Sequence, residues 1–307
     1  MADTLVIVNP RSANSSTGRR WAEIERRLHA AVPVFDAVFT ERPNHATELA
    51  RQGAADHEQV IVVGGDGTIN EVVNGLLADN RPVRADLVLA IVPRGTGADF
   101  VRTMGIPHDL DAAVQRLTTG TPREVDVAKV RYRGLDGSEQ VRYFINQASV
   151  GMGPVVCVEV NRSSKRLGGR VSFLRGILVA TFRYRSQPVL ISVDGAPPER
   201  VLLRNLWIAN GRFSGGGICA APRARPDDGL LDVVRVPELG FWQQTLSMRR
   251  LRSGAFVEDP RVTYATARRV EVQPAGPVAL HIEVEGEPIG SIPATFEMLD
   301  TRLKILT

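Results

Sequence analysis

The sequence predicts an α/β domain with an open, mostly parallel sheet, followed by a β-rich antiparallel sandwich domain. In the first third of the chain, short all-apolar runs such as 5–8 and 60–63 alternate with segments of helical periodicity. This alternation is typical of a parallel sheet that is covered by helices on both faces. From about residue 121 onward, strand-like segments follow one another across turns such as Asp136-Gly137, as in an antiparallel sandwich.

The apolar periodicity predicts the elements in order. In the first domain, strands are expected at 5–8, 34–39, 60–63 and 87–92, and helices at 21–28, 46–52, 69–77 and 109–117. In the second domain, strands are expected at 125–133, 140–147, 189–193, 200–210, 231–236, 263–273 and 278–285, with helices at 155–185 and 241–252. The resulting domains are 1–121 and 122–292, and a C-terminal segment, 293–307, is expected to pack back on the first domain.

Length and composition exclude several classes of protein. The 307 residues contain no stretch of about 20 apolar residues, so no membrane-spanning helix is expected. The N-terminus lacks a secretory signal, and we therefore expect a cytoplasmic protein. Cys157 and Cys219 form no recognisable pair and are expected to be free thiols. The net charge of +4 suits nucleotides or acidic membrane surfaces, whereas basic residues without interleaved aromatic residues disfavour nucleic-acid binding.

A glycine-rich turn, Gly64-Gly65-Asp66-Gly67-Thr68, lies between a predicted buried strand and a predicted helix. Glycines let the backbone approach a ligand closely, and the N–H groups at the start of a helix favour phosphate. A carboxylate beside a phosphate requires a cation or a donor between them, so Asp66 suggests Mg²⁺. The alternative is a tight turn without a ligand. The patterns of P-loop and Rossmann nucleotide sites are absent from the sequence.

Five segments, spread along the whole chain, resemble one known family. They are GGDGTINEVVNGL at 64–76, PRGTGADFVR at 93–102, NPRS at 9–12, REVDVAK at 123–129, and a glycine-rich segment from Asn210-Gly211 to DDGLLD at 227–232. These motifs resemble the bacterial-type diacylglycerol kinases, whose superfamily also contains sphingosine, ceramide and NAD kinases and phosphofructokinases. The resemblance implies an ATP-dependent, Mg²⁺-dependent lipid kinase with an NAD kinase/phosphofructokinase-like α/β domain and an active site in the cleft between the domains.

The resemblance assigns the nucleotide site to the first domain. Its residues would be Asn9, Thr40, Gly64, Gly65, Asp66, Gly67, Thr68, Ile69, Asn70, Gly95 and Thr96. Most of them follow predicted strands, at the carboxyl edge where open α/β sheets bind ligands. On the sequence alone, Thr40 would be an ordinary threonine at a strand end.

The resemblance also assigns carboxylates to Mg²⁺ and to proton transfer. A water-linked network near Mg²⁺ would contain Asp66, Asp99, Asp126 and Asp227. A structural Mg²⁺ would bind the side chain of Asp228 and the backbone carbonyls of Arg225 and Leu230, a sparse oxygen ligand set that suits this ion. The proton acceptor would be Glu287, with Asp66 and Asp99 as further catalytic residues. Taken alone, 227–229 would be a polar turn and 285–287 a polar hairpin tip.

Three positions depart from the family's pattern. Ala13 stands where the family usually has glycine, Ala98 where it usually has asparagine, and Glu285 where it usually has aspartate. Loss of the asparagine amide removes a donor and an acceptor from the nucleotide side. These changes suggest drift in nucleotide or substrate handling and not an inactive enzyme, because the aspartates and Glu287 remain.

The acceptor would be a lipid alcohol that the enzyme reaches at a membrane surface. Residues 161–185 mix basic side chains such as Lys165 with apolar ones such as Phe173, which favours a helix lying on an anionic membrane. The alternative is a core-packing helix with a solvated basic face. A second basic stretch, 249–252, is expected to lie at a helix C-terminus.

The preferred acceptor is diacylglycerol, which would give phosphatidate. Sphingoid bases, monoacylglycerol, phosphatidylglycerol and polyprenyl-type alcohols stay open as acceptors. The rival functions are a soluble-substrate kinase of the NAD kinase type and a non-catalytic nucleotide- or lipid-binding protein. Peripheral membrane contact and a homodimer are both compatible with the lipid kinase.

Overall fold

The structure, a computed structural model, describes residues 2–95, 97–162, 184–238, 250–277 and 280–307, together with Gly176 and Val179. Four predictions fall wholly or partly outside these residues: the nucleotide role of Thr96, the basic helix at 161–185, the helix at 241–252 with its basic stretch, and the strand at 278–285. None of the helices within the described ranges has the length and apolar character needed to span a bilayer. The chain forms two compact units: unit 1 is Met1–Val127 with Leu299–Thr307, and unit 2 is Ala128–Met298.

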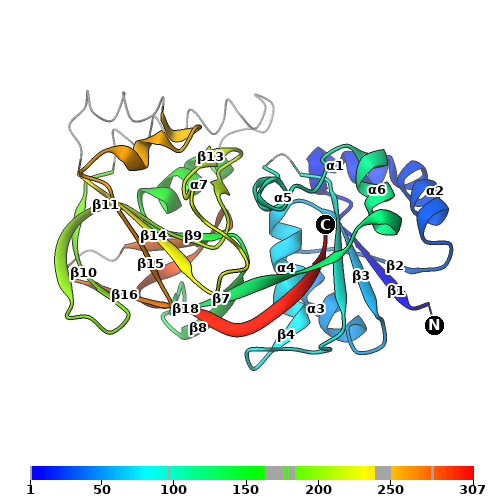
Figure 1. Cartoon of the computed structure of the whole chain (residues 1–307), viewed down its shortest axis with the longest axis horizontal. Helices are drawn as coiled ribbons and strands as arrows, with labels where there is room; N and C mark the ends of the chain where they lie inside the picture. Colours follow the sequence, from blue (N-terminus) through cyan, green and yellow to red (C-terminus); the bar gives the residue numbers. More distant parts are fainter. Residues whose placement is uncertain are drawn as a thin grey trace. The chain divides into compact units, whose positions relative to one another are not determined.

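Unit 1 contains the predicted parallel sheet (Figure 1). Its strands are β1 (Thr4–Val8), β2 (Asp36–Phe39), β3 (Gln59–Gly64), β6 (Val88–Pro93) and the last residues of β18 (Glu287–Leu306), in the order β2-β1-β3-β6-β18. These neighbours pair in parallel, and β18 joins β6 through Lys304 opposite Val88. The runs in β1 and β3 show no alternation because their apolar residues are buried on both faces.

Helices cover both faces of this sheet. They are α1 (Ser12–Arg19), α2 (Trp21–Ala31), α3 (His45–Gly53), α4 (Asp66–Leu76), α5 (Asp99–Met104) and α6 (Leu110–Thr119), and a short ribbon, β4 (Leu77–Ala78) with β5 (Arg81–Pro82), follows α4. Leu28 of α2 and Val114 of α6 pack with Val6 on one face. On the other face, Gly53 at the end of α3 lies against Leu5, and α3 packs against α4. The turns that leave β1, β3 and β6 therefore emerge at one edge of a doubly covered sheet.

Unit 2 is the predicted β-rich antiparallel domain. Its strands are β7 (Pro122–Gly134), which begins in unit 1, β8 (Glu139–Phe144), β9 (Gln147–Gly151), β10 (Gln187–Val193), β11 (Glu199–Ala209), β12 (Phe213–Ser214), β13 (Ile218–Cys219), β14 (Leu231–Pro237), β15 (Thr263–Ala267), β16 (Arg269–Pro274), β17 (His281–Val284) and the first part of β18. They pair in the order β15-β14-β11-β10-β16-β18, while β9 links β11 to β17, and β17 pairs with β18. Among the described residues of this unit, α7 (Met152–Arg162) and a 3₁₀ turn (Ala255–Glu258) accompany the strands.

Several predicted elements need correction. The strand expected at 263–273 is two strands, because β15 pairs with β14 whereas β16 pairs with β10 and β18. The helix expected from Ile69 begins at Asp66, so the second half of the glycine turn is already helical. No clear apolar periodicity indicates α1, α5 or the long strand β18 in the sequence, and the two helices are too short to display a period. Cys157 and Cys219 are free thiols, as predicted.

Candidate active site

Three turns meet at the carboxyl ends of β1, β3 and β6. Asn9, directly after β1, donates its side-chain amide to the hydroxyl oxygen of Thr68 at 2.8 Å and its backbone N–H to the carbonyl of Val63 at 3.0 Å. Arg94, directly after β6, donates its backbone N–H to the carbonyl of Gly64 at 2.6 Å. The structure thus brings together Asn9, the glycine turn and the turn that contains Gly95, and their role in binding a nucleotide stays a prediction.

The glycines at this edge allow the backbones to approach very closely. A Cβ atom on Gly95 would lie 2.7 Å from the Cα of Gly65, and one on Gly64 would lie 2.6 Å from the Cβ of Thr68. Gly65 is the N-cap of α4, and no side-chain cap of this helix is found in the described part of the chain. The first N–H groups of α4 are therefore available to an anionic ligand, which the partial positive charge of the helix start favours.

Asp66 connects the glycine turn to α5. Its Oδ1 accepts the backbone N–H of Asp99 at 3.1 Å and that of Phe100 at 3.4 Å. Burial raises the pKa of the Asp66 carboxyl, and these hydrogen bonds only partly oppose the shift. A Cβ on Gly97 would lie 2.6 Å from one oxygen of Asp66 and 3.6 Å from one oxygen of Asp99, so the two carboxylates lie near each other.

Asp126 is buried in β7 and accepts a hydrogen bond from the Arg302 Nε at 2.8 Å. Both residues belong to unit 1, and this ion pair ties β7 to the C-terminal strand. Of the four aspartates expected around Mg²⁺, the structure brings Asp66 and Asp99 together, gives Asp126 an arginine partner, and places Asp227 in unit 2. Their joint network stays a prediction.

The other predicted nucleotide residues differ in what they can offer. Thr40 follows β2, is buried, and donates its backbone N–H to the carbonyl of Val8 at 2.9 Å. Ile69 is buried and apolar, so only its backbone can contact a nucleotide. Asn70 is also buried, and its side-chain oxygen accepts the amide of Asn74 at 3.3 Å.

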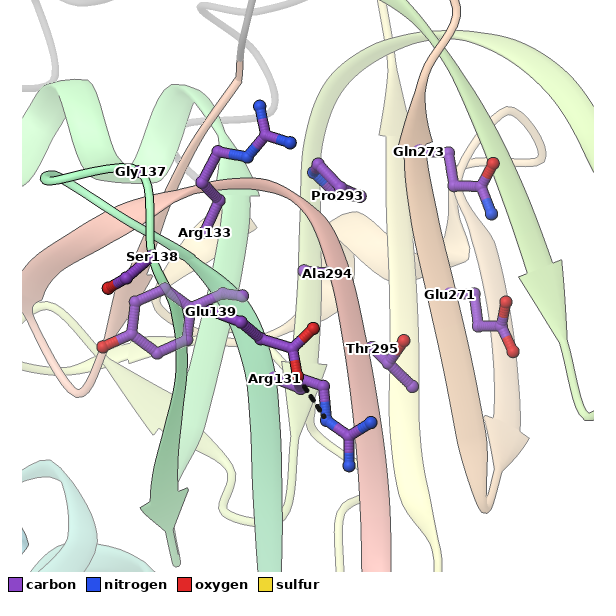
Figure 2. Close-up of a pocket in the computed structure, with 11 residues that line it drawn as sticks. Arg131, Arg133, Gly137, Ser138, Glu139, Glu271, Gln273, Pro293, Ala294 and Thr295 are labelled. Atoms are coloured by element: carbon purple, nitrogen blue, oxygen red, sulfur yellow. Dashed lines mark ion pairs between the residues drawn. The ribbon is translucent and has the colours of Figure 1, made fainter.

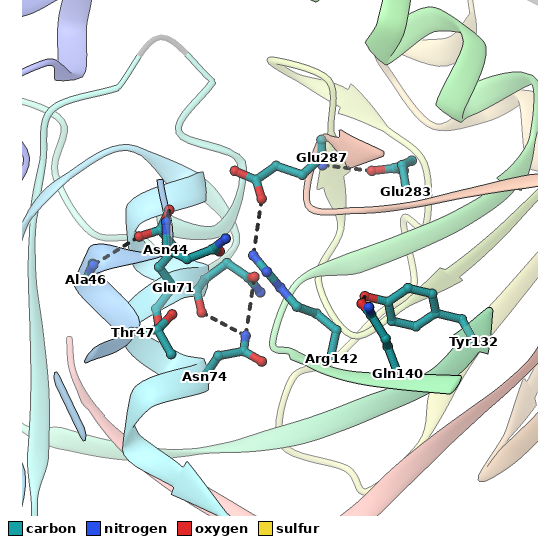
Figure 3. Close-up of polar contacts among 12 residues, drawn as sticks. Asn44, Ala46, Thr47, Glu71, Asn74, Tyr132, Gln140, Arg142, Glu283 and Glu287 are labelled. Carbon is teal, nitrogen blue, oxygen red and sulfur yellow. Dashed lines mark hydrogen bonds and ion pairs between the residues drawn. The ribbon is translucent and has the colours of Figure 1, made fainter. Parts of the chain in front are cut away.

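Glu71 positions the loop that follows β2, although no motif indicated this role. Its carboxylate accepts the backbone N–H of Asn44 at 3.0 Å and that of Ala46 at 3.1 Å, and so caps α3 (Figure 3). We expect Glu71→Ala to lower the free energy of unfolding of unit 1 by about 1–2 kcal/mol. Urea denaturation measures this, with Glu48→Ala, which removes an exposed partner of Arg42, as the control that should change little. Equal losses in the two variants would contradict the capping role.

In unit 2, Glu287 follows a tight hairpin turn between β17 and β18. The two turn residues, Glu285 and Gly286, have φ values of +50° and +86°, the signs of a type I′ turn. The Glu287 carboxylate forms an ion pair with the Arg142 guanidinium of β8 at 3.1 Å (Figure 3). The Glu287 side chain is 44% exposed and the Arg142 side chain 15% exposed, so the carboxylate is accessible while its partner is largely covered.

Two further carboxylates hold this turn. The Oε1 of Glu285 accepts the backbone N–H groups of Ile145 and Asn146, both at 2.9 Å. Glu283 is buried and bonds to Ser149 and to Gly286. No sequence motif indicated Arg142 or Glu283. The available signal for Glu283 was a charged residue inside the apolar run of β17.

The predicted metal segment forms a polar turn in unit 2. The Oδ1 of Asp228 accepts the backbone N–H of Leu230 at 3.1 Å, and Gly229 between them has φ +75°. One carboxylate and the backbone carbonyls of such a turn are hard oxygen donors, so the residues present fit a Mg²⁺ ion that keeps several waters. In the described ranges, no three or more His, Cys, Asp or Glu side chains form a cluster that could hold a metal ion.

A separate pocket of about 230 Å³ lies in unit 2 beside the β7–β8 hairpin and β16 and β18 (Figure 2). Its wall is polar and apolar in about equal parts, with the Arg131–Glu139 ion pair at 3.5 Å on one side and Gln273 and Thr295 on the other. None of the predicted site residues lines it.

Comparison with known protein families covers both units. Residues 3–130 match the diacylglycerol kinase catalytic domain, and residues 146–307, more than half of the chain, match the YegS C-terminal NAD kinase beta sandwich-like domain. The chain belongs to the diacylglycerol kinase family. It is an enzyme of the kinase class, a phosphotransferase.

Relatives in the diacylglycerol kinase family match this chain along almost its whole length. A diacylglycerol kinase of Staphylococcus carnosus is 29% identical over 98% of this chain and 94% of its own, and one of Bacillus subtilis is 28% identical over 98% and 95%. A crystal structure of a putative diacylglycerol kinase from Bacillus anthracis has a TM-score of 0.77, with 25% identity over 96% of this chain and 92% of that one. Yeast NADH kinase complexed with NADH shares the fold, with a TM-score of 0.57 and 13% identity, over 99% of this chain and 83% of that one.

The three departures from the family's pattern share one conformation. Ala13, Ala98 and Glu285 have φ values of +50°, +55° and +50°, where side chains other than those of glycine, asparagine and aspartate are strained. The usual family residues at these positions are the ones that tolerate this region. Glycine, asparagine and aspartate, the residues expected from the resemblance, would be less strained at these three positions.

This strain predicts the effect of Ala98→Asn. We expect the substitution to raise the free energy of unfolding by about 0.5–1 kcal/mol, because asparagine adopts positive φ more readily than alanine. Urea denaturation measures the gain. The control is Ala22→Asn on the exposed face of α2, where asparagine should give no gain because alanine is the better helix former. If Ala98→Asn lowered the free energy of unfolding as much as Ala22→Asn does, the explanation would be contradicted.

Proposed function

We propose that the chain transfers the γ-phosphate of ATP to the hydroxyl of a lipid alcohol, diacylglycerol, to give phosphatidate. The observation that carries this proposal is the close approach of the glycine turns after β3 and β6 beside the uncapped start of α4. That arrangement offers backbone N–H groups to phosphate oxygens and excludes side chains from the same space. The names of the full-length relatives support diacylglycerol as the acceptor.

In this proposal the residues of unit 1 position the nucleotide. The first N–H groups of α4, with the Thr68 hydroxyl held by Asn9, bind the phosphates, and Asp66 keeps the β3 turn and the start of α5 together. Phosphoryl transfer depends chiefly on such positioning and charge stabilisation, because the transition state is loose.

Glu287 of unit 2 would accept the proton of the lipid hydroxyl. The ion pair with the Arg142 guanidinium at 3.1 Å holds the Glu287 carboxylate in place. The carboxylate is a weak base for an alcohol, but late proton transfer in a loose transition state requires only a weak base.

Mg²⁺ would be held by the Asp228 carboxylate and the carbonyls of Arg225 and Leu230. When bound there, it would supply a hard positive charge that orders the 225–230 turn. The aspartate network of Asp66, Asp99, Asp126 and Asp227 is proposed as a further place for water-mediated contact with Mg²⁺.

The lipid would be reached by peripheral contact with the membrane. The net charge of +4 and the mixed basic and apolar composition of 161–185 support attraction to an anionic surface.

Thr96 is proposed to contact the nucleotide beside Gly95.

A second candidate function is a kinase for a soluble acceptor such as NAD. The likeness to yeast NADH kinase and the NAD kinase-like description of the C-terminal domain favour it. The GTGADF segment at 95–100 and the DDGLLD turn at 227–232 oppose it, because they resemble the lipid kinase branch.

Transfer of ³²P from [γ-³²P]ATP separates the two functions. The purified protein is given Mg²⁺ and, in parallel, NAD or mixed micelles that contain diacylglycerol, monoacylglycerol, a sphingoid base, phosphatidylglycerol or a polyprenol. We expect labelled phosphatidate as the main product. Labelled NADP, or no labelled product with any lipid, would overturn the proposal.

A further inference from the structure

Glu283 is a buried carboxylate to which the proposed reaction gives no role. It lies in β17, two residues before the type I′ turn, and its side chain has only 4% exposure. The register of the sheet pairs it with Ser149 of β9. Carboxylates are rarely buried this deeply without a specific partner, so its contacts indicate what it does.

Each oxygen of Glu283 has its own donor. The Oε1 accepts the hydroxyl proton of Ser149 at 2.6 Å, and the Oε2 accepts the backbone N–H of Gly286 at 2.7 Å. Figure 3 shows the Glu283 carboxylate directed toward the backbone beside Glu287. Gly286 is the second turn residue and directly precedes Glu287. The buried carboxylate therefore links the interior of unit 2 to the peptide that presents the proposed proton acceptor.

Stability of the core does not explain the choice of glutamate. Burial raises the pKa of the Glu283 carboxyl, which means that its ionised form is disfavoured there despite both hydrogen bonds. An apolar side chain of similar volume would avoid the cost of burying this carboxylate. What such a side chain would lose is the acceptor for the Gly286 N–H.

The rest of the turn is held on its other side. Glu285 accepts two backbone N–H groups from 145–146 and donates its own N–H to the carbonyl of Gln147 at 2.9 Å. Those contacts position the first turn residue, and the Glu283 contact positions the second. Arg142 then fixes the Glu287 side chain itself.

We propose that Glu283 is a positioning residue for Glu287: its buried carboxylate holds the Gly286 N–H and thereby sets where the proton acceptor lies. This inference rests on the proposed role of Glu287 as the proton acceptor. Small displacements of a reacting group cost large factors in rate, so loosening this turn should lower kcat more than it affects nucleotide binding.

Steady-state kinetics of three variants test the proposal. Glu283→Met removes the acceptor while keeping the volume, and we expect kcat to fall about 10–100-fold with the KM for ATP within about threefold of the natural protein. Glu283→Gln keeps an oxygen for Gly286 and can donate its amide to Ser149, so it should stay within about threefold in kcat. The matched control, Ser149→Ala, removes only the other hydrogen bond of Glu283 and should also stay within about threefold.

A double-mutant cycle separates positioning from a general structural effect. If Glu283 acts through Glu287, Glu283→Met should not lower kcat further in a protein that already carries Glu287→Gln. Losses that multiply in the double variant would overturn the proposal, as would full activity of Glu283→Met.

Hydrogen exchange gives a readout that does not depend on catalysis. The Gly286 amide should exchange faster in Glu283→Met than in the natural protein and in Ser149→Ala, because only Glu283→Met removes its acceptor. Unchanged exchange would refute the contact itself. If no lipid were phosphorylated by the natural protein, the proposed function would fail, while the exchange result would still decide whether Glu283 holds the turn.

Discussion

Replacing Glu287 with glutamine should lower kcat for lipid phosphorylation by about 10²–10⁴-fold, the usual contribution of a positioned general base. Glutamine keeps the size of the side chain but cannot accept the proton of the lipid hydroxyl. The KM for ATP should stay within about threefold, because the nucleotide is bound by residues of unit 1 in this account. Initial rates of ³²P transfer to diacylglycerol micelles measure both quantities.

The control for this prediction is Glu139→Gln. Glu139 lies in the same unit, is 73% exposed, and forms an ion pair with Arg131 at 3.5 Å, so it tests the loss of a carboxylate without a catalytic role. Its kcat should equal that of the natural protein. If Glu287→Gln and Glu139→Gln had the same kcat, Glu287 could not be the proton acceptor.

The second large effect is expected from Gly95→Ala. The new Cβ would lie 2.7 Å from the Cα of Gly65, a separation that real side chains do not tolerate, so the two turns must move apart. Loss of one hydrogen bond to a charged phosphate is worth about 1.5–3 kcal/mol, or roughly 10–100-fold in affinity. Isothermal titration with ATP and Mg²⁺ should show that weakening.

Gly105→Ala is the matched control for this substitution. Gly105 ends α5 in the same unit with φ +70°, and a Cβ there would meet nothing within 4 Å. It strains the backbone locally without forcing the turns apart, so the Kd for ATP should change less than about threefold. Equal weakening in both variants would show that the loss reflects general destabilisation of unit 1.

The architecture could be predicted because buried strands and helices have recognisable patterns of apolar residues. The all-apolar runs at 5–8 and 60–63 predicted strands buried on both faces, and the glycine turn after the second run marked the edge of the sheet. Strand ends and short helices could not be predicted. The break at Arg268 depends on which strands pair on either side of it, and α5 has only six residues, too few for a period.

The candidate site could be predicted only in part, for a similar reason. Motifs identify residues near a ligand, such as Asn9 and Thr68, because the chemistry of the ligand restricts them. They do not reveal which side chains hold those residues. The contact of Asp66 with the start of α5, the capping of α3 by Glu71 and the bond from Glu283 to Gly286 all depend on how separate segments meet in the fold.

A crystal structure with Mg²⁺ and a non-hydrolysable ATP analogue tests the central claim most directly. We predict phosphate oxygens within hydrogen-bonding distance of the backbone N–H groups at the start of α4, beside Thr68 and Gly95. Phosphates bound elsewhere on unit 1, with the turns after β1, β3 and β6 empty, would contradict the account.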